Sequence, residues 1–123
     1  SKYLDLEKAE QLQQAQGLLE AGIMSGATSS RFNPTAAVTK QEAAIIIANM
    51  YRYLNQDLSK VYNELASNYR DIANLTLEAR QSIAILELFG IVDGMGAFNP
   101  TQTLSRGEFA ELFYRALSAI DYL

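Results

Sequence analysis

The sequence contains no cysteine and no histidine. Without cysteine there is no disulfide framework, and no thiolate is available as a nucleophile or metal ligand. Without histidine there is no imidazole base, no imidazole metal ligand and no histidine pH switch. These absences exclude most hydrolase triads, zinc sites and haem sites, and we expect neither a cofactor nor a bound metal.

Positive charge is also scarce, since 10 Lys and Arg residues stand against 14 Asp and Glu residues, for a net charge of -4. A nucleic-acid binder normally shows a basic face, so neither nucleic acid nor an anionic membrane surface is an expected partner. No apolar run approaches the roughly 20 residues that a spanning helix needs. There is no signal peptide, and the chain starts at Ser1 rather than Met, so we expect a processed product or a piece of a longer protein.

The 123 residues are 49% hydrophobic, which is enough to build a core. This length favours one domain, or two small halves that share a core. The composition argues against a disordered tail, which would be poor in apolar residues.

An internal repeat organises the chain, and it indicates a repeated structural unit. The first copy carries Gly22-Ile23, then Phe32-Asn33-Pro34-Thr35, then Thr39-Lys40-Gln41-Glu42. The second copy carries Gly90-Ile91, then Phe98-Asn99-Pro100-Thr101, then Ser105-Arg106-Gly107-Glu108. Chance is a poor explanation for so many matches in the same order.

Each copy is predicted to form a helix, a long loop and a second helix. The first helix of copy one is expected over residues 5–21, where apolar residues recur at helical spacing, and Gly22 is placed for a left-handed C-terminal cap. Its counterpart is expected over residues 76–89, with Gly90 as its stop. The residues expected to face inward are Leu6, Ala9, Leu12, Ala15 and Leu19 in the first, and Ala79, Ile83 and Leu86 in the counterpart.

The second helix of each copy begins at a capping box. Thr39 with Glu42, and Ser105 with Glu108, have the spacing at which a hydroxyl and a carboxylate exchange hydrogen bonds with the first backbone N–H groups. The residues expected inward are Ala43, Ile46, Ile47, Met50 and Leu54 in the first copy, and Phe109, Leu112, Phe113, Ala116, Leu117 and Ile120 in the second.

A connecting helix is expected between the copies, over residues 55–68, on the apolar positions Leu58, Val61, Tyr62 and Leu65. No run is long and alternating enough to predict a strand. The sequence therefore predicts an all-α chain with repeat 1 at residues 1–54, the connecting helix at residues 55–68 and repeat 2 at residues 69–123, forming one compact unit.

A cation occupies the first position of both second helices, at Lys40 and Arg106. A helix N-terminus is partly positive, so an exposed cation there costs about 0.3–1 kcal/mol. A paired cation and a row of free backbone N–H groups make a good anion site. The loop glycines Gly26 and Gly94 would let a ligand approach the backbone closely.

Structural roles remain open for these residues. Lys40 and Arg106 would also fit as partners of a carboxylate, or as solvated side chains. Glu42 and Glu108 are better explained as caps than as ligands. Phe32 and Phe98 are better explained as core residues under the loops than as stacking platforms, and Pro34 and Pro100, each after an asparagine, as turn residues.

The ordered set resembles the S-layer homology (SLH) module, whose unit has an aromatic-x-Asp opening, a helix ending in Gly-Ile, a glycine-rich Phe-x-Pro loop and a Thr-Arg-Ala-Glu-like helix start. The second copy fits well, at Tyr69-Arg70-Asp71, Gly90-Ile91, Gly94 to Pro100, and Ser105 to Glu108. The first copy fits less well, at Tyr3, Asp5, Gly22-Ile23, Gly26, Phe32 to Pro34, and Thr39 to Glu42. The resemblance covers nearly the whole chain apart from the connecting helix.

The resemblance implies an exported bacterial protein held non-covalently at the cell surface, in the cell wall or S-layer. The usual ligand of the family is a secondary cell wall polymer, often with pyruvate ketals on N-acetylmannosamine. By position, Arg106 and Lys40 would meet that carboxylate, with contributions from Gly26, Gly94, Asp5 and Asp71. Arg forks onto a carboxylate whereas Lys is a point charge, so the copies should not bind equally.

Two departures from the family pattern leave alternatives open. The family commonly has a Trp where this chain has Glu10 and Glu78, and it commonly has three repeats. A third repeat is missing, or two chains associate, or the two-repeat form closes on itself.

We therefore expect a non-enzymatic wall-binding module. The alternative is an assembly domain of the same fold that has lost polymer binding and mediates oligomerisation or protein docking. An enzyme is a third class, since carboxylates alone support glycoside chemistry, but no spacing singles out a pair.

Overall fold

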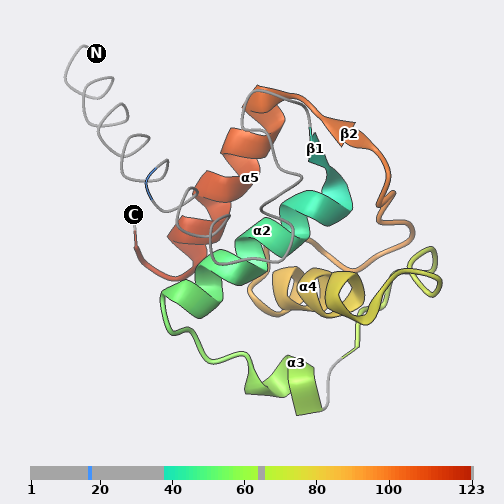
Figure 1. Cartoon of the computed structure of the whole chain (residues 1–123), viewed down its shortest axis with the longest axis horizontal. Coiled ribbons are helices and arrows are strands. Elements are labelled where there is room, and N and C mark those ends of the chain that lie inside the picture. Colours follow the sequence, from blue (N-terminus) through green and yellow to red (C-terminus); the bar gives the residue numbers. More distant parts are fainter. Residues whose placement is uncertain (1–16, 18–37, 64–65, 123) are drawn as a thin grey trace.

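Four helices carry most of the chain that is described by the computed structural model, which covers Gly17, residues 38–63 and residues 66–122 (Figure 1). In chain order the elements are β1 (Val38–Thr39), α2 (Lys40–Tyr53), α3 (Ser59–Asn63), α4 (Leu77–Leu88), β2 (Thr103–Leu104) and α5 (Arg106–Ala119). The predicted helical class is confirmed.

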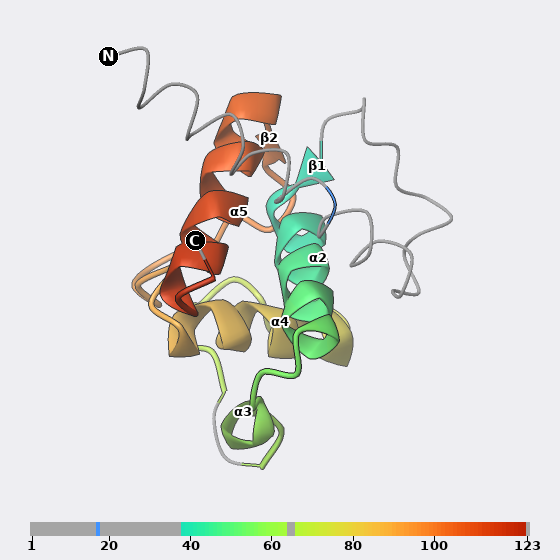
Figure 2. The same cartoon turned by 90° about the vertical axis from the view of Figure 1, so that its left-hand side faces the viewer.

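Helix α2 is the centre of the core. It packs against both α4 and α5, and Figure 2 shows it beside α5 and above α4. A helix that is apolar on most of its surface is suited to such a position, because neighbours cover more than one of its faces. Its buried residues are Ala43, Ala44, Ile45, Ile46, Ile47, Ala48, Met50 and Tyr51. Of the positions expected inward on this helix and its cap, only Leu54 is half-buried.

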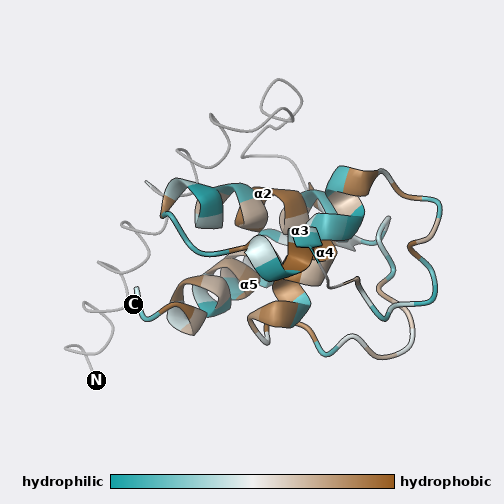
Figure 3. Cartoon of the chain, turned by 90° about the horizontal axis from the view of Figure 1, so that it is seen from below, coloured by the Kyte–Doolittle hydropathy of each residue, from teal (hydrophilic) through white to brown (hydrophobic). Residues whose placement is uncertain are grey.

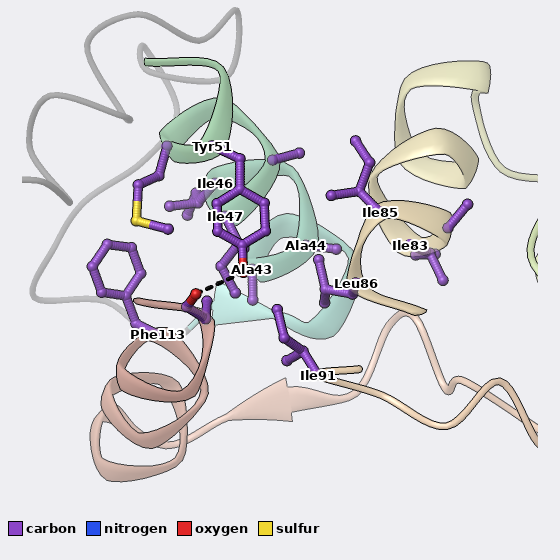
Figure 4. Packing of buried hydrophobic residues seen from close by; sticks show 14 of the residues in the cluster. Ala43, Ala44, Ile46, Ile47, Tyr51, Ile83, Ile85, Leu86, Ile91 and Phe113 are labelled. Carbon is purple, nitrogen blue, oxygen red and sulfur yellow. Dashed lines mark hydrogen bonds between the residues drawn. The ribbon is translucent and has the colours of Figure 1, made fainter. Parts of the chain in front are cut away.

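Tyr51 joins α2 to α5 through a buried hydrogen bond. Its hydroxyl donates to the carbonyl oxygen of Ala116 at 2.7 Å, as drawn in Figure 4. Its ring lies 4.5 Å from that of Phe89, centroid to centroid. Burial raises the pKa of the Tyr51 phenol, so the hydroxyl stays protonated and remains a donor.

Helix α4 has the limits that its sequence predicts. The Thr76 hydroxyl accepts from the Ala79 N–H at 3.1 Å, and Gly90 takes the left-handed conformation with φ +73° just beyond the end. Ile85 and Leu86 lie between α4 and α2 in Figure 4. Seen from below, the hydrophobic stretches of α2 and α4 lie where the two helices meet (Figure 3). The predicted inward residues of α4 are buried.

Helices α2 and α5 both begin with the predicted capping box. In α5 the Ser105 hydroxyl accepts from the Glu108 N–H at 3.1 Å, and the Glu108 carboxylate accepts from the Ser105 N–H at 2.9 Å. The buried residues of α5 are Phe109, Phe113, Ala116 and Leu117. Leu112 and the C-cap residue Ile120, which were also expected to face inward, are only half-buried.

A small sheet, which the sequence did not indicate, ties the two repeats together. Strands β1 and β2 pair antiparallel, with Val38 opposite Leu104 and Thr39 opposite Thr103. Two residues are too few to show the alternation by which a strand is recognised in sequence. Because β1 directly precedes α2 and β2 closely precedes α5, the pairing places the starts of these two helices side by side although they are far apart in sequence.

The connecting helix is shorter than predicted, because only Ser59–Asn63 is helical among the described residues of the expected range 55–68. Asn55 has φ +59°, which is incompatible with a helix. The Asp57 carboxylate accepts from the Ser59 N–H at 3.0 Å, and the helix starts at Ser59. Residues 66–68 are not helical, and Leu65 lies outside the described residues. Leu58 and Val61 are buried as expected, whereas Tyr62 is exposed.

The predicted first helix over residues 5–21 lies outside the described residues, apart from Gly17, which is helical. The division into residues 1–54, 55–68 and 69–123 remains a prediction. Within the described ranges, no helix has the length and hydropathy to cross a membrane.

Candidate functional site

Lys40 and Arg106 are the first residues of α2 and α5, as the sequence predicts. The β1–β2 ladder ends directly at Lys40, whose N–H donates to the carbonyl oxygen of Gln102 at 2.9 Å. Next along α2, the N–H of Gln41 donates to the carbonyl oxygen of Pro100 at 3.0 Å. The start of the repeat 1 helix is therefore seated on the loop of repeat 2.

The side chain of Lys40 is half-buried against that loop. Its ammonium lies 5.0 Å from the centroid of the Phe98 ring, a cation–π geometry. The hydrogen bonds from Ser105 and, less strongly, the Lys40 ammonium hold the pKa of Glu108 below its usual range. Lys40 therefore contacts the Phe98 ring and is near enough to the Glu108 carboxylate to influence its pKa.

The expected row of free backbone donors is not found at α2. Its first two N–H groups bond to loop carbonyls, and the third, of Glu42, bonds to the Thr39 hydroxyl at 3.3 Å. An anion at this helix start would meet the ammonium without help from these N–H groups.

The start of α5 is different. Arg106 is exposed, and no residue in the described part of the chain pairs with its guanidinium. Its N–H and that of Gly107 donate to no acceptor among the described residues, whereas the Glu108 N–H is capped by Ser105. Two backbone donors and a forked cation are therefore open here, which is the arrangement predicted for an anion site.

Asp71 fixes the loop of repeat 2. One carboxylate oxygen accepts from the Phe98 N–H at 2.8 Å and the other from the Asn99 N–H at 2.9 Å. These bonds hold the pKa of Asp71 below its usual range. Both oxygens are engaged inside the chain, and the predicted contact of Asp71 with a ligand stays a prediction.

Gly94 is needed by the packing of the chain itself. Its φ is +72°, and a Cβ there would lie 2.7 Å from Oε2 of Glu87. Glu87 in turn accepts from the Asn68 N–H at 3.2 Å, which holds the segment before repeat 2. This geometry explains the glycine without a ligand, and close approach of a ligand at Gly94 stays a prediction.

Phe98 and Pro100 occupy structural positions in the loop. Phe98 is only 2% exposed and its ring centroid lies 5.2 Å from that of Tyr69, so it is a core residue under the loop. Pro100 is half-buried and accepts at its carbonyl oxygen from α2. Glu78, at the position where the family commonly has Trp, is exposed in the first turn of α4.

The equivalent residues of repeat 1, namely Asp5, Gly26, Phe32 and Pro34, lie outside the described residues. Sequence reasoning missed the carbonyl oxygens of Pro100 and Gln102 as partners of α2, because backbone acceptors leave no signature in side-chain identity. It also missed Arg115, which donates from Nη2 to the carbonyl oxygen of Ile91 at 2.7 Å. Among the residues that are described, no cluster of three or more acidic groups could hold a metal.

Comparison with known proteins identifies the repeat. The family model of the S-layer homology domain matches residues 16–44 and 68–110, which is more than half of the chain. The chain belongs to the SLH domain family. The first match includes Thr39 to Glu42, and the second runs from the Tyr69 opening to the start of α5.

An endoglucanase of Bacillus sp. (strain KSM-635) is 31% identical to this SLH chain over 117 residues. The match covers 88% of this chain and 12% of the endoglucanase, so the chain spans about an eighth of that protein's length. No solved structure matches the chain. SLH domains anchor proteins at the bacterial cell surface, and membership of the family therefore implies anchoring at the cell wall.

Proposed function

We propose that this SLH chain is a non-enzymatic anchor that binds an anionic secondary cell wall polymer, with pyruvate ketals as the bound carboxylates. The observation that carries the proposal is the start of α5, where the Arg106 guanidinium and two backbone N–H groups are open to solvent among the described residues. Charge-assisted hydrogen bonds from such donors are the strong class for a carboxylate.

The two helix starts are unequal in this proposal. Arg106 offers a planar fork with two neighbouring N–H donors, whereas Lys40 offers a point charge that the Phe98 ring already stabilises. We expect the Arg106 site to supply most of the affinity. Lys40 adds a second, weaker contact at the junction of the two repeats.

Asp71 and Gly94 serve the site by shaping the repeat 2 loop. The two hydrogen bonds of Asp71 hold the loop at Phe98 and Asn99. This loop carries the Pro100 and Gln102 carbonyls on which α2 is seated. Asp5 and Gly26 have the corresponding positions in repeat 1, and their role rests on the family resemblance.

Co-sedimentation with Gram-positive wall sacculi tests the proposal. The chain should pellet with intact sacculi and stay in solution with sacculi stripped of their secondary polymer. The Arg80→Ala variant, which removes an exposed α4 cation, should behave like the native chain. Equal binding to intact and stripped sacculi would contradict the polymer as the ligand.

One observation favours a second candidate, an assembly domain that has lost polymer binding. The first turn of α2 has its N–H groups engaged, and the Lys40 ammonium lies on Phe98, so this site is partly occupied by the chain itself. Leu77 and Met95 are 60% and 75% exposed, which leaves apolar contacts for a partner. Light scattering over a range of concentrations separates the two, since a monomer that binds polymer argues against assembly.

A further inference from the structure

A depression of about 460 Å³ lies on repeat 2, and neither Lys40 nor Arg106 is among the residues that line it. It is open to solvent, since Gly90, Asp93 and Arg115 in its lining are exposed. The residues that line it are Tyr69, Gly90, Ile91, Val92, Asp93 and Arg115. They come from the segment before α4, the segment after α4 and, for Arg115, the second half of α5.

The lining includes the Tyr69 ring and, beside it, the Asp93 carboxylate, one oxygen of which is still able to accept hydrogen bonds. The Tyr69 hydroxyl donates to Oδ1 of Asp93 at 3.3 Å, and the same oxygen accepts from the Met95 N–H at 2.9 Å. Oδ2 of Asp93 accepts no hydrogen bond from the described residues. Burial is the main cause that raises the pKa of the Tyr69 phenol, so the hydroxyl stays a donor.

The lining also includes the guanidinium of Arg115, which is held in place by one hydrogen bond and keeps further donors. Arg115 bonds from Nη2 to the carbonyl oxygen of Ile91 at 2.7 Å. A guanidinium has five N–H donors, and no other described residue accepts from Arg115. The side chain is therefore positioned by one bond and retains donors for a ligand.

This combination suits an uncharged, polyhydroxylated ring. A sugar offers hydroxyls that donate to a carboxylate, oxygens that accept from a guanidinium, and a C–H face that packs on Tyr69. The opposite charges of Asp93 and Arg115 offset one another, so the pair selects for neither sign of charge and suits a neutral ligand with both donors and acceptors.

Contacts through the buried Phe98 ring relate the depression to Lys40, the cation of repeat 1. The Tyr69 ring contacts the Phe98 ring at 5.2 Å, and Phe98 carries the Lys40 ammonium at 5.0 Å. Two short contacts thus connect the wall of the depression to Lys40.

We propose that this depression is a subsite for an uncharged sugar unit of the wall polymer, held by Tyr69, Asp93 and Arg115. The proposal rests on the proposed function for the source of the sugar, since it assigns a second contact with the same glycan.

Amide shift mapping by NMR on the full chain tests it. The probes are two ligands, namely the uncharged methyl glycosides of common hexoses and hexosamines, and a polymer fragment that bears pyruvate ketals. The uncharged glycosides should shift the amides of Gly90, Ile91 and Val92 and leave those of Lys40, Arg106 and Gly107 in place. The ketal-bearing fragment should shift both groups.

The outcomes separate this subsite from the anion site. With the ketal-bearing fragment, shifts at residues 90–92 without shifts at the helix starts would support the subsite and count against the proposed function. Shifts at the helix starts with the ketal-bearing fragment, and no shifts at residues 90–92 with either probe, would overturn the subsite and leave the proposed function standing. No shift in either group would overturn both.

Conservative variants give a second readout. Asp93→Asn keeps an oxygen that accepts the bonds inside the chain and removes the negative charge. Arg115→Lys keeps one donor for the Ile91 carbonyl and removes the other guanidinium donors. Each should weaken glycoside binding about ten- to a hundredfold, as loss of a hydrogen bond to a charged group does. Glu111→Gln and Arg80→Lys are the matched exposed controls and should leave it unchanged. Unchanged glycoside binding in both test variants would overturn the subsite.

Discussion

The ammonium of Lys40, in the first repeat, lies 5.0 Å from the ring centroid of Phe98, in the second. The contact follows from the β1–β2 ladder, which seats the start of α2 on the Pro100 and Gln102 carbonyls. The cation of one repeat is thereby placed on the loop of the other. If Lys40 binds a ligand as proposed, residues of both repeats will surround that ligand.

Arg106→Ala should weaken polymer binding and leave folding intact. Loss of a charge-assisted bond costs about 1–3 kcal/mol of binding free energy. Removal of a cation from a helix N-terminus should at the same time raise the free energy of unfolding by about 0.3–1 kcal/mol. Titration calorimetry and urea unfolding measure the two changes, with Arg80→Ala as control. A fall in stability that parallels the loss of binding would indicate a structural role.

Lys40→Met should reduce polymer affinity less than Arg106→Ala does. The methionine keeps an apolar stem over Phe98 and removes the charge. Stability should fall by no more than about 1 kcal/mol, the size of a partly exposed cation–π contact. Calorimetric titration of both variants with the same polymer checks the order, and a larger loss at Lys40 would contradict the unequal roles assigned to the two helix starts.

Tyr51→Phe should destabilise the chain by about 1–3 kcal/mol, because it leaves the buried Ala116 carbonyl without the hydroxyl that bonds to it. Polymer binding at a temperature where the variant is folded should be unchanged. Tyr53→Phe on the same helix is the matched control, since Tyr53 is 55% exposed and should tolerate the change. Urea unfolding of both variants measures the difference, and equal stabilities would show that the buried bond contributes little.

Gly94→Ala should destabilise the chain by about 1–2 kcal/mol or more. The alanine would have to adopt φ +72° and place its Cβ 2.7 Å from Oε2 of Glu87. Gly107→Ala in α5 is the opposite case, because nothing lies within 4 Å of the added Cβ and the backbone is helical. It should stabilise by about 0.4–1 kcal/mol. Thermal unfolding of the two variants tests whether the first lowers and the second raises stability. An unchanged stability of Gly94→Ala would mean that the loop adjusts.

Asp71 should make stability depend on pH on the acid side. Its folded-state pKa lies below the usual value of 3.8, because the Phe98 and Asn99 N–H groups bond to the ionised form. The stabilisation is therefore complete above the unfolded pKa and is lost as pH falls through the folded one. Asp71→Asn should show a smaller loss of stability than the native chain between neutral pH and pH values below 3.8.

Urea unfolding across that range measures the effect. Asp121→Asn, which removes an exposed carboxylate with no donor among the described residues, should retain the native pH dependence. An Asp71→Asn profile that parallels the native one would assign the acid sensitivity to other groups.

What could be predicted from sequence was local. The capping boxes at Thr39 and Ser105 depend on residues three apart, and the end of α4 at Gly90 depends on one backbone conformation. Such signals are contained within a single turn, and the helix limits that follow from them are confirmed.

What could not be predicted was contact between distant residues. The Tyr51–Ala116 bond spans 65 residues and the Asp71–Phe98 bond 27, and no spacing rule relates them. The ladder at Thr39 and Thr103 uses backbone groups alone. The expected row of free N–H groups at Lys40 is wrong for this reason, because its partners are carbonyls supplied by the other repeat.

The most direct test of the account is calorimetric titration of the chain with a purified secondary cell wall polymer, before and after removal of its pyruvate ketals. The account predicts binding of the pyruvylated polymer and at least a tenfold weaker affinity without the ketals, the equivalent of roughly 1.4 kcal/mol. It also predicts that the double variant Lys40→Met, Arg106→Ala no longer distinguishes the two polymers. Equal affinity of the native chain for both polymers would contradict carboxylate recognition at the helix starts.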